Sequence, residues 1–229
     1  MTDMQFTLLL ILSVGITFIA QMLVKSRYAK YSQVATNSRI TGADVARKIL
    51  DANGMSDVPV VATSGTLTDN YNPSKRTVNL SEGVYGASTV AGIAVAAHEC
   101  GHAIQHHTGY SFLRLRTSMV PVVNLSSKVS YALIVAGAVL GYLKLYEIGI
   151  ILESVAVAFH MVTLPVEFDA SRRGLKQLED FGVFDGTEME GCKKMLTAAA
   201  LTYVGAALSA IVSMLRLLLQ LNNSKRERR

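Results

Sequence analysis

Four long apolar runs constrain this sequence more than any other feature. They cover residues 6–24, 129–143, 148–166 and 195–215, and only the third contains a charged side chain or a histidine, Glu153 and His160. A run of about 20 apolar residues is long enough to cross a bilayer as a helix. Charged residues make up 17% of the chain, whereas a typical soluble domain has about 25%. The sequence therefore argues against an ordinary cytosolic enzyme.

The first run predicts an uncleaved N-terminal membrane anchor over residues 1–25. A cleaved signal peptide is the alternative, but no Lys or Arg precedes the run and no small-residue cleavage site follows it. Positive charge is concentrated directly after the run, at Lys25, Arg27 and Lys30, and in a basic tail at residues 222–229. Charge placed in this way is typical of membrane-flanking segments, so we expect no nucleic-acid partner.

The other runs predict the rest of the membrane part. We expect a transmembrane helical hairpin over residues 129–166, a membrane-proximal loop and helix over 167–194, and a C-terminal membrane helix over 195–221. For the last of these, a core helix of a soluble bundle is the alternative. Small residues recur there at every fourth position, as in Gly205, Ser209 and Ser213. This spacing lets membrane helices approach closely.

Residues 26–128 predict a compact domain. Residues 39–52 have the apolar period of a helix, with Thr41 as its cap and Asn53-Gly54 as its end. Residues 58–62 and 77–80 predict short strands, and the Asn- and Pro-rich residues 69–73 between them predict a turn. The predicted fold class is thus mainly α, with multi-pass membrane helices and a small α+β domain.

The segment His98-Glu99-Cys100-Gly101-His102 carries the clearest chemistry. It lies late in an Ala-rich predicted helix, residues 88–105, for which Ser88 is a plausible cap. Positions four apart share one helix face, so His98 and His102 can bind the same Zn²⁺. Glu99 can then reach a water on the metal as a general base. The flanking residues are apolar, and these polar side chains would be costly to bury without a metal or a partner.

A catalytic zinc site needs a third protein ligand. The choices are His106, His107, His160 and a downstream carboxylate. Three histidines along one straight helix could not easily converge on one ion, because His106 lies a further turn away, about 6 Å along the axis. This reasoning points to Glu167, just after Pro165, where we expect a kink.

Asp169 has two interpretations. It either orients a ligand histidine through the ring N–H or caps a helix over residues 171–179.

The chain resembles the YugP-like membrane neutral zinc metallopeptidases over nearly its whole length. The resemblance rests on TDNYNP at 68–73, VNLS at 78–81, VY at 84–85, AAHECGHAIQ at 96–105 and PVEFDASRR at 165–173. It implies a zincin-like catalytic domain with a gluzincin-type site. In such a site His98, His102 and Glu167 are the zinc ligands and Glu99 is the catalytic acid/base.

Several further residues are candidates for substrate contacts. The strand at 77–80 precedes the helix with the zinc motif, so Val78, Asn79 and Leu80 are expected to bind substrate as an edge strand, with an ordinary core strand as the alternative. The sequence does not choose among the candidate oxyanion stabilisers, which are Tyr85, His106, His107, Tyr110 and Arg172.

Glu153, His160 and Glu167 are spaced by seven and share one helical stripe. One interpretation is that the three side chains form a polar track toward the metal. The alternative is that Glu153 merely lies near the membrane interface and His160 makes one internal hydrogen bond.

The sequence therefore predicts a membrane-embedded zinc endopeptidase, in which zinc-bound water activated by Glu99 attacks a peptide carbonyl. The alternative is a non-enzymatic membrane scaffold or adaptor with a structural zinc site, and a soluble peptidase is a weaker one. Expected partners are a protein or peptide substrate, the lipid bilayer, and a membrane protein or a second copy of the chain.

The basic residues near residue 25 and Arg172 favour a multi-pass protein of the cell membrane with its catalytic domain in the cytosol. A spanning fourth run would then place the basic tail outside, against the positive-inside rule.

Overall fold

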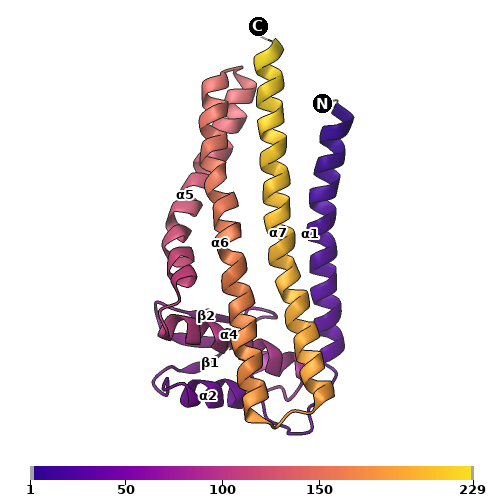
Figure 1. Ribbon diagram of the computed structural model, residues 1–229, viewed down its shortest axis with the longest axis vertical. Helices are drawn as coiled ribbons and strands as arrows, with labels where there is room; N and C mark the ends of the chain where they lie inside the picture. Colours follow the sequence, from indigo (N-terminus) through magenta and orange to yellow (C-terminus); the bar gives the residue numbers. More distant parts are fainter. Residues whose placement is uncertain (1–2, 228–229) are drawn as a thin grey trace. The chain divides into compact units, whose positions relative to one another are not determined.

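The computed structural model describes residues 3–227 and all but a few of their side chains. Arg228 and Arg229 of the basic tail lie outside the described residues. The chain divides into two compact units. We call Met1–Gln21, Arg114–Leu164 and Thr202–Arg229 the apolar unit, and Met22–Leu113 with Pro165–Leu201 the α+β unit. Helices dominate and the one assigned sheet is small (Figure 1), which confirms the predicted fold class.

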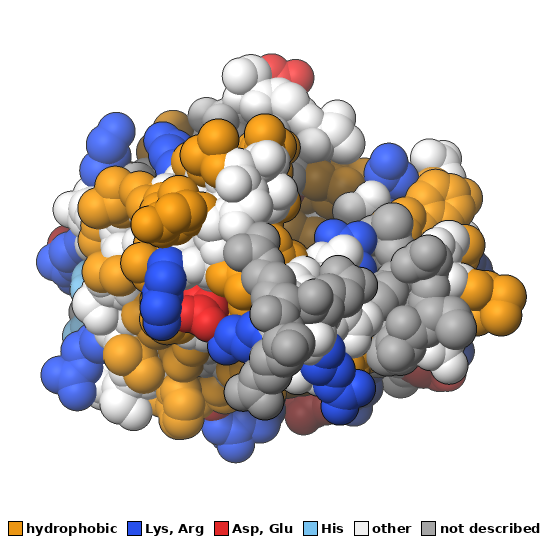
Figure 2. Space-filling model, turned by 90° about the horizontal axis from the view of Figure 1, so that it is seen from above, with side chains coloured by type: hydrophobic (Ala, Val, Ile, Leu, Met, Phe, Trp, Pro, Cys, Tyr) orange, Lys and Arg blue, Asp and Glu red, His pale blue; other side chains and the backbone are white. Residues whose placement is uncertain are grey.

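Four long helices supply the apolar unit and continue into the α+β unit. They are α1 (Asp3–Tyr31), α5 (Ser111–Val139), α6 (Leu143–Phe181) and α7 (Gly186–Glu227). Each is long and apolar enough to cross a membrane. Figure 2 shows one face of the molecule, on which hydrophobic side chains are exposed beside Lys and Arg side chains. An exposed apolar surface of this kind is expected where a protein contacts lipid.

Two of the long helices extend well beyond the apolar runs that predict them. The apolar run that was expected to begin at residue 129 belongs to a helix that begins at Ser111. α6 continues through Pro165 to Phe181, so no separate helix begins at residue 171 for Asp169 to cap. A proline removes one backbone hydrogen bond, and long membrane-type helices tolerate this loss.

Small and hydroxyl side chains join the helices of the apolar unit. Thr17 on α1 and Ser209 on α7 are hydrogen-bonded at 2.8 Å, and a Cβ added at Gly205 would lie 3.4 Å from Ala20. The predicted stripe of small residues thus contacts α1. Between α5 and α6, the hydroxyl of Ser130 donates to the carboxylate of Glu153 at 2.9 Å.

The α+β unit begins with a capped helix. α2 (Gly42–Ala52) has Thr41 as its N-cap, in a reciprocal capping box with Asp44, and Asn53 as its C-cap. Gly54 follows with a φ of +70°, a conformation that favours glycine. The predicted cap and end of this helix are therefore confirmed, whereas residues 39–41 precede it.

Three short strands follow, β1 (Val60–Thr63), β2 (Asn70–Asn72) and β3 (Thr77–Ser81), in the spatial order β1-β3-β2. β3 pairs with β1 in parallel and with β2 antiparallel. The turn predicted at residues 69–73 is mostly strand, and the true turn comes later, at residues 73–76. The amides of Asn70 and Asn79 bond to each other across the two strands at 2.9 Å, so the asparagines that suggested a turn stabilise the pairing instead.

The short helix α3 (Glu82–Tyr85) leads into α4 (Val90–His107), the central helix of the α+β unit. Thr89 caps α4 through a bond from the Gly92 backbone N–H, so the expectation for Ser88 is off by one residue. The Ala-rich part of α4 packs into the buried core together with residues of α2, β3 and α7.

Two glycines bring α4 and α6 into backbone contact. A Cβ at Gly101 on α4 would lie 2.1 Å from the carbonyl oxygen of Ala170, and one at Gly174 on α6 would lie 2.4 Å from that of Ala97. Only glycine fits at either position. The close approach brings the first turns after Pro165 beside the histidines of α4.

Candidate metal centre

Three side chains from two helices converge on one point. His98 and His102 lie on α4, and Glu167 lies on α6. The Nε2 atoms of His98 and His102 lie 3.3 and 3.5 Å from Oε2 of Glu167, and all three ligand atoms lie within 4.8 Å of one another. Within residues 3–227, no other group of His, Cys, Asp or Glu side chains meets this condition.

The spacing of these atoms suits a zinc ion. Tetrahedral ligands at bond lengths of about 2.0–2.1 Å lie about 3.3–3.4 Å from one another. The two distances to Glu167 are close to that value. Two imidazoles and one carboxylate are also a donor set that zinc accepts, and three protein ligands leave one position for water.

The outer nitrogen of each histidine is already hydrogen-bonded. Nδ1 of His98 lies 3.0 Å from the hydroxyl of Ser171, and Nδ1 of His102 lies 3.0 Å from Oε1 of Gln105. The Gln105 side chain is fully buried, and its Nε2 donates to the carbonyl of Val166 and the carboxylate of Asp169. Because Nε2 faces two acceptors, Oε1 must face His102, so the ring proton of His102 resides on Nδ1. The lone pair on Nε2 is then directed at the metal position.

Asp169 is linked to His102 only indirectly, through hydrogen bonds to and from Gln105. In the hydrogen bonds of the described residues, its carboxylate accepts from Gln105, Arg172 and Arg173. The expectation that Asp169 bonds a ligand histidine directly is therefore wrong. A carboxylate and two guanidinium groups instead hold the amide of Gln105 in place.

Glu99 lies beside the ligands on α4. Its side chain is buried, and its Oε2 accepts a hydrogen bond from the backbone N–H of Tyr71 at 2.8 Å. Burial raises the pKa of the Glu99 carboxyl, while the neighbouring His98 and His102 act in the opposite direction. A bound cation would also lower this pKa.

His102 is subject to opposing effects. Burial disfavours its charged form, but the hydrogen bond and the negative charge of Glu167 outweigh burial, and the pKa of His102 is raised. A metal ion takes the place of that proton, because the ion needs the neutral imidazole as its ligand.

The strand expected to bind substrate is not an edge strand. Val78, Asn79 and Leu80 lie in β3, which has a neighbour on each side, and Val78 and Leu80 are fully buried. A strand paired on both sides cannot accept another. The edge strands are β1 and β2, and it is on β2 that the N–H of Tyr71 faces Glu99. Sequence reasoning missed this edge because the composition of residues 69–73 suggested a turn.

The five oxyanion candidates lie in different surroundings. The hydroxyl of Tyr71 lies 2.7 Å from Nδ1 of His106, so the residue that contacts Glu99 also contacts His106. Tyr85 packs against the core, and His107 is exposed at the end of α4. The guanidinium of Arg173 lies over the ring of Tyr110, and Arg172 is bound to Asp169. Of the five, His106 is therefore the one joined by a hydrogen bond to a neighbour of Glu99.

The polar track stays a prediction. Glu153 and His160 belong to the apolar unit, and Glu167 belongs to the α+β unit. Within the apolar unit, Glu153 accepts from Ser130 and the ring of His160 lies near that of Phe159.

Comparison with known proteins also indicates a zinc protein. Residues 6–222 match the model of a family described as "Putative neutral zinc metallopeptidase". The chain belongs to this family. The matched residues include the apolar helices almost entirely and the whole segment from His98 to His102.

A relative from Bacillus subtilis (strain 168), named "Putative membrane protease YugP", is 47% identical over 224 residues. The alignment covers 98% of this chain and 100% of that protein. No solved structure matches the chain. The resemblance to the YugP-like family that the sequence motifs indicate is confirmed.

Proposed function

We propose that this chain is a membrane-embedded zinc endopeptidase. The observation that carries the proposal is the convergence of His98, His102 and Glu167 at zinc-like spacing, with Glu99 beside them. The family and the membrane protease name of the relative support the same reading. A bound Zn²⁺ would polarise a peptide carbonyl and lower the pKa of a water molecule.

The chain itself supplies the proton transfers. The buried Glu99 is placed to take a proton from water and to pass it to the leaving amine. The N–H of Tyr71 holds one oxygen of this carboxylate, which leaves the other for the water. The Tyr71–His106 pair is our candidate for stabilising negative charge on the carbonyl oxygen, since the Tyr71 hydroxyl contacts His106 and the Tyr71 backbone N–H contacts Glu99.

The open edge of β2 is our candidate for the substrate strand site. A peptide added there would pair with the backbone next to Glu99, and backbone pairing is largely independent of side chains. A broad sequence tolerance in the substrate is the expected result.

The scaffold alternative fits the donor set less well. A structural zinc site is usually closed by four protein ligands. The group found among the described residues has three, which suits a site that keeps a position open for water.

The test uses the purified full chain with casein as substrate. We expect Glu99→Gln to keep one zinc per chain while cleavage falls at least about 100-fold, because a general base typically contributes 10²–10⁴-fold. His98→Ala should lose both zinc and cleavage. The control is Glu82→Gln, which changes an exposed carboxylate on α3 in the same way and should leave both properties unchanged.

Two results would contradict the proposal. Cleavage retained by Glu99→Gln would remove Glu99 from the reaction. Zinc bound by the parent chain without any hydrolysis would favour the scaffold.

A further inference from the structure

A groove between α1 and α7 lies within the α+β unit, and none of the three zinc ligands lines it. It has a volume of about 300 Å³. α1 contributes Leu23 and, one turn later, Arg27, while α7 contributes Lys193 and Lys194 and then Ala198 and Leu201. The two helices run in opposite directions (Figure 1), and Gly191 of α7 lies near the ring of Tyr31. Both helices therefore place their charged residues at one end of the groove and their apolar residues at the other.

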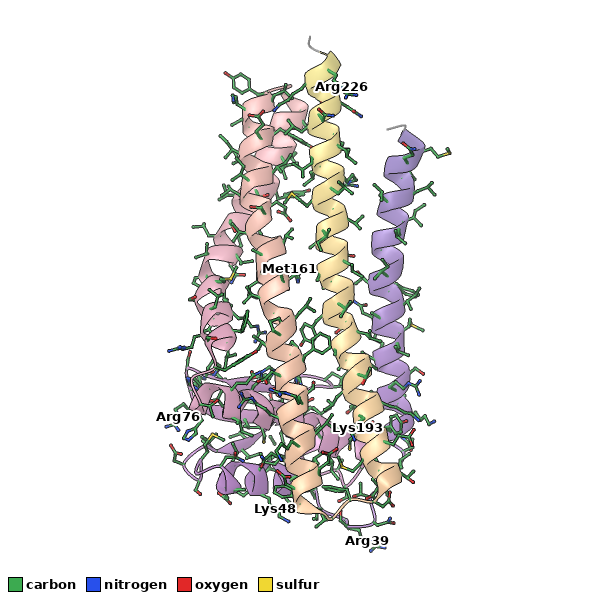
Figure 3. All side chains as sticks on the ribbon, viewed as in Figure 1. Arg39, Lys48, Arg76, Met161, Lys193 and Arg226 are labelled. Carbon is green, nitrogen blue, oxygen red and sulfur yellow. The ribbon has the colours of Figure 1, made fainter. Side chains whose placement is uncertain are left out.

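The charged end carries an excess of positive charge. Arg27, Lys193 and Lys194 face a single acidic lining residue, Glu190, which pairs with Lys194 at 2.5 Å. Lys193 extends from α7 (Figure 3) and pairs with Glu179 at 2.9 Å. Each lysine therefore has one carboxylate partner, and Arg27 is the third cation that lines the groove. An anion at this end would meet one more positive charge than negative charge.

The apolar end continues along both helices without a charged residue. The residues of α1 that precede Leu23 are uncharged and mostly apolar back to residue 6, and those of α7 from Met195 onward are uncharged and mostly apolar to residue 215. Both helices belong to the candidate membrane spans. An occupant of the whole groove must then be charged at one end and have a long apolar part at the other. A free phosphate ion meets only the first of these conditions.

We propose that this groove binds the headgroup of an anionic phospholipid, with its phosphate at Arg27, Lys193 and Lys194. One acyl chain lies along Leu23 and Leu201. Basic side chains at a membrane surface attract anionic lipids, and the groove adds a shaped site to that general attraction. The proposal is independent of the zinc site.

The experiment is a lipid titration of the full chain in neutral detergent, followed by native mass spectrometry. The probes are phosphatidylglycerol and phosphatidylcholine with the same acyl chains. We expect phosphatidylglycerol to bind at least about tenfold more tightly, since each Lys or Arg near the surface contributes roughly fivefold. The triple variant Arg27→Gln, Lys193→Gln, Lys194→Gln should lose this preference.

A matched variant controls for net charge. Arg39→Gln, Lys48→Gln and Lys75→Gln together remove three exposed positive charges of the α+β unit outside the groove. This variant should keep the preference for phosphatidylglycerol, and unchanged melting temperatures would show that both variants are folded. Equal binding of the two lipids by the parent chain, or a preserved preference in the groove variant, would overturn the proposal. Displacement of phosphatidylglycerol by millimolar inorganic phosphate would also overturn it, because it would show a simple anion site.

Discussion

At the scale of single residues, Gln105 determines which ring nitrogen of His102 is free to bind a metal. Two acceptors on α6 fix the Nε2 atom of its amide, so only the Oε1 atom can face the imidazole of His102. Sequence reasoning had a signal for this role, because Gln105 follows His102 by three positions and lies on the adjacent part of the same helix face. Ser171 gives no such signal, because the ligand whose Nδ1 it contacts, His98, lies on the other helix.

We predict that Gln105→Leu lowers zinc affinity about 10- to 100-fold, the usual effect of removing an outer partner of a metal ligand. The lost acceptor leaves Nδ1 of His102 without the bond that sets its tautomer. A zinc competition titration with a chromophoric chelator would measure the change.

Gln105→Glu should restore the affinity only in part, since a carboxylate oxygen can again accept from His102 but the donor to Val166 and Asp169 is lost. Gln177→Leu is the control, because Gln177 bonds to Asn53 and not to a ligand. Unaltered zinc affinity in Gln105→Leu would refute the positioning role.

At the scale of elements, the site depends on how closely α4 and α6 pack. Glu167 has a place in it because Gly101 lets the backbone of Ala170 approach, and Gly174 does the same for Ala97. Each substitution to alanine would favour the helical state by about 1 kcal/mol, but overpacking of this kind costs about 1–3 kcal/mol or more.

We predict that Gly101→Ala lowers the melting temperature of the purified chain and weakens zinc binding together, because the helices must move apart. Differential scanning fluorimetry and metal analysis would measure the two effects. Gly86→Ala is the matched control, since an added Cβ there would have no neighbour within 4 Å and its φ is −96°. A Gly101→Ala chain as stable as the parent would contradict the close packing of the two helices.

The elements also show which parts of the fold the sequence could predict. α2 and α4 were predictable because a helical period and a cap occur in the same short segment. β2 was not, because three residues rich in Asn become a strand only through pairing with β3, a contact that local propensity does not contain. The continuation of α6 past Pro165 was hidden for a similar reason, since packing against α4 overrides the local preference of proline. Glu167 could still be predicted, since few carboxylates or histidines remained as a third ligand.

At the scale of the whole molecule, the direction in which each long helix crosses a membrane decides where hydrolysis would occur. The basic residues that follow the first apolar run and those that precede the fourth, Lys193 and Lys194, belong to the α+β unit. Their positive charges favour the cytosol for that unit. The described part of the basic tail belongs to the apolar unit, where Lys225 pairs with Glu147 at 2.6 Å.

We predict that Ser111→Cys is labelled by a membrane-impermeant maleimide only after the membrane is opened, and Ser224→Cys is labelled in intact cells. The two native cysteines interfere little, because Cys100 and Cys192 are both buried and burial raises the pKa of the Cys100 thiol. Ser74→Cys, in an exposed turn of the α+β unit, should behave like Ser111→Cys. Labelling of Ser111→Cys and Ser224→Cys from the same side would show that α7 does not cross the membrane.

The division of the ligands between α4 and α6 has a consequence for the order of synthesis. His98 and His102 leave the ribosome before the whole of the α5–α6 hairpin up to residue 164, and Glu167 emerges only after it. A nascent chain therefore holds two of its three ligands until both apolar segments have been made. If the proposed function is right, the catalytic centre of this chain stays incomplete for as long as its membrane part is unfinished.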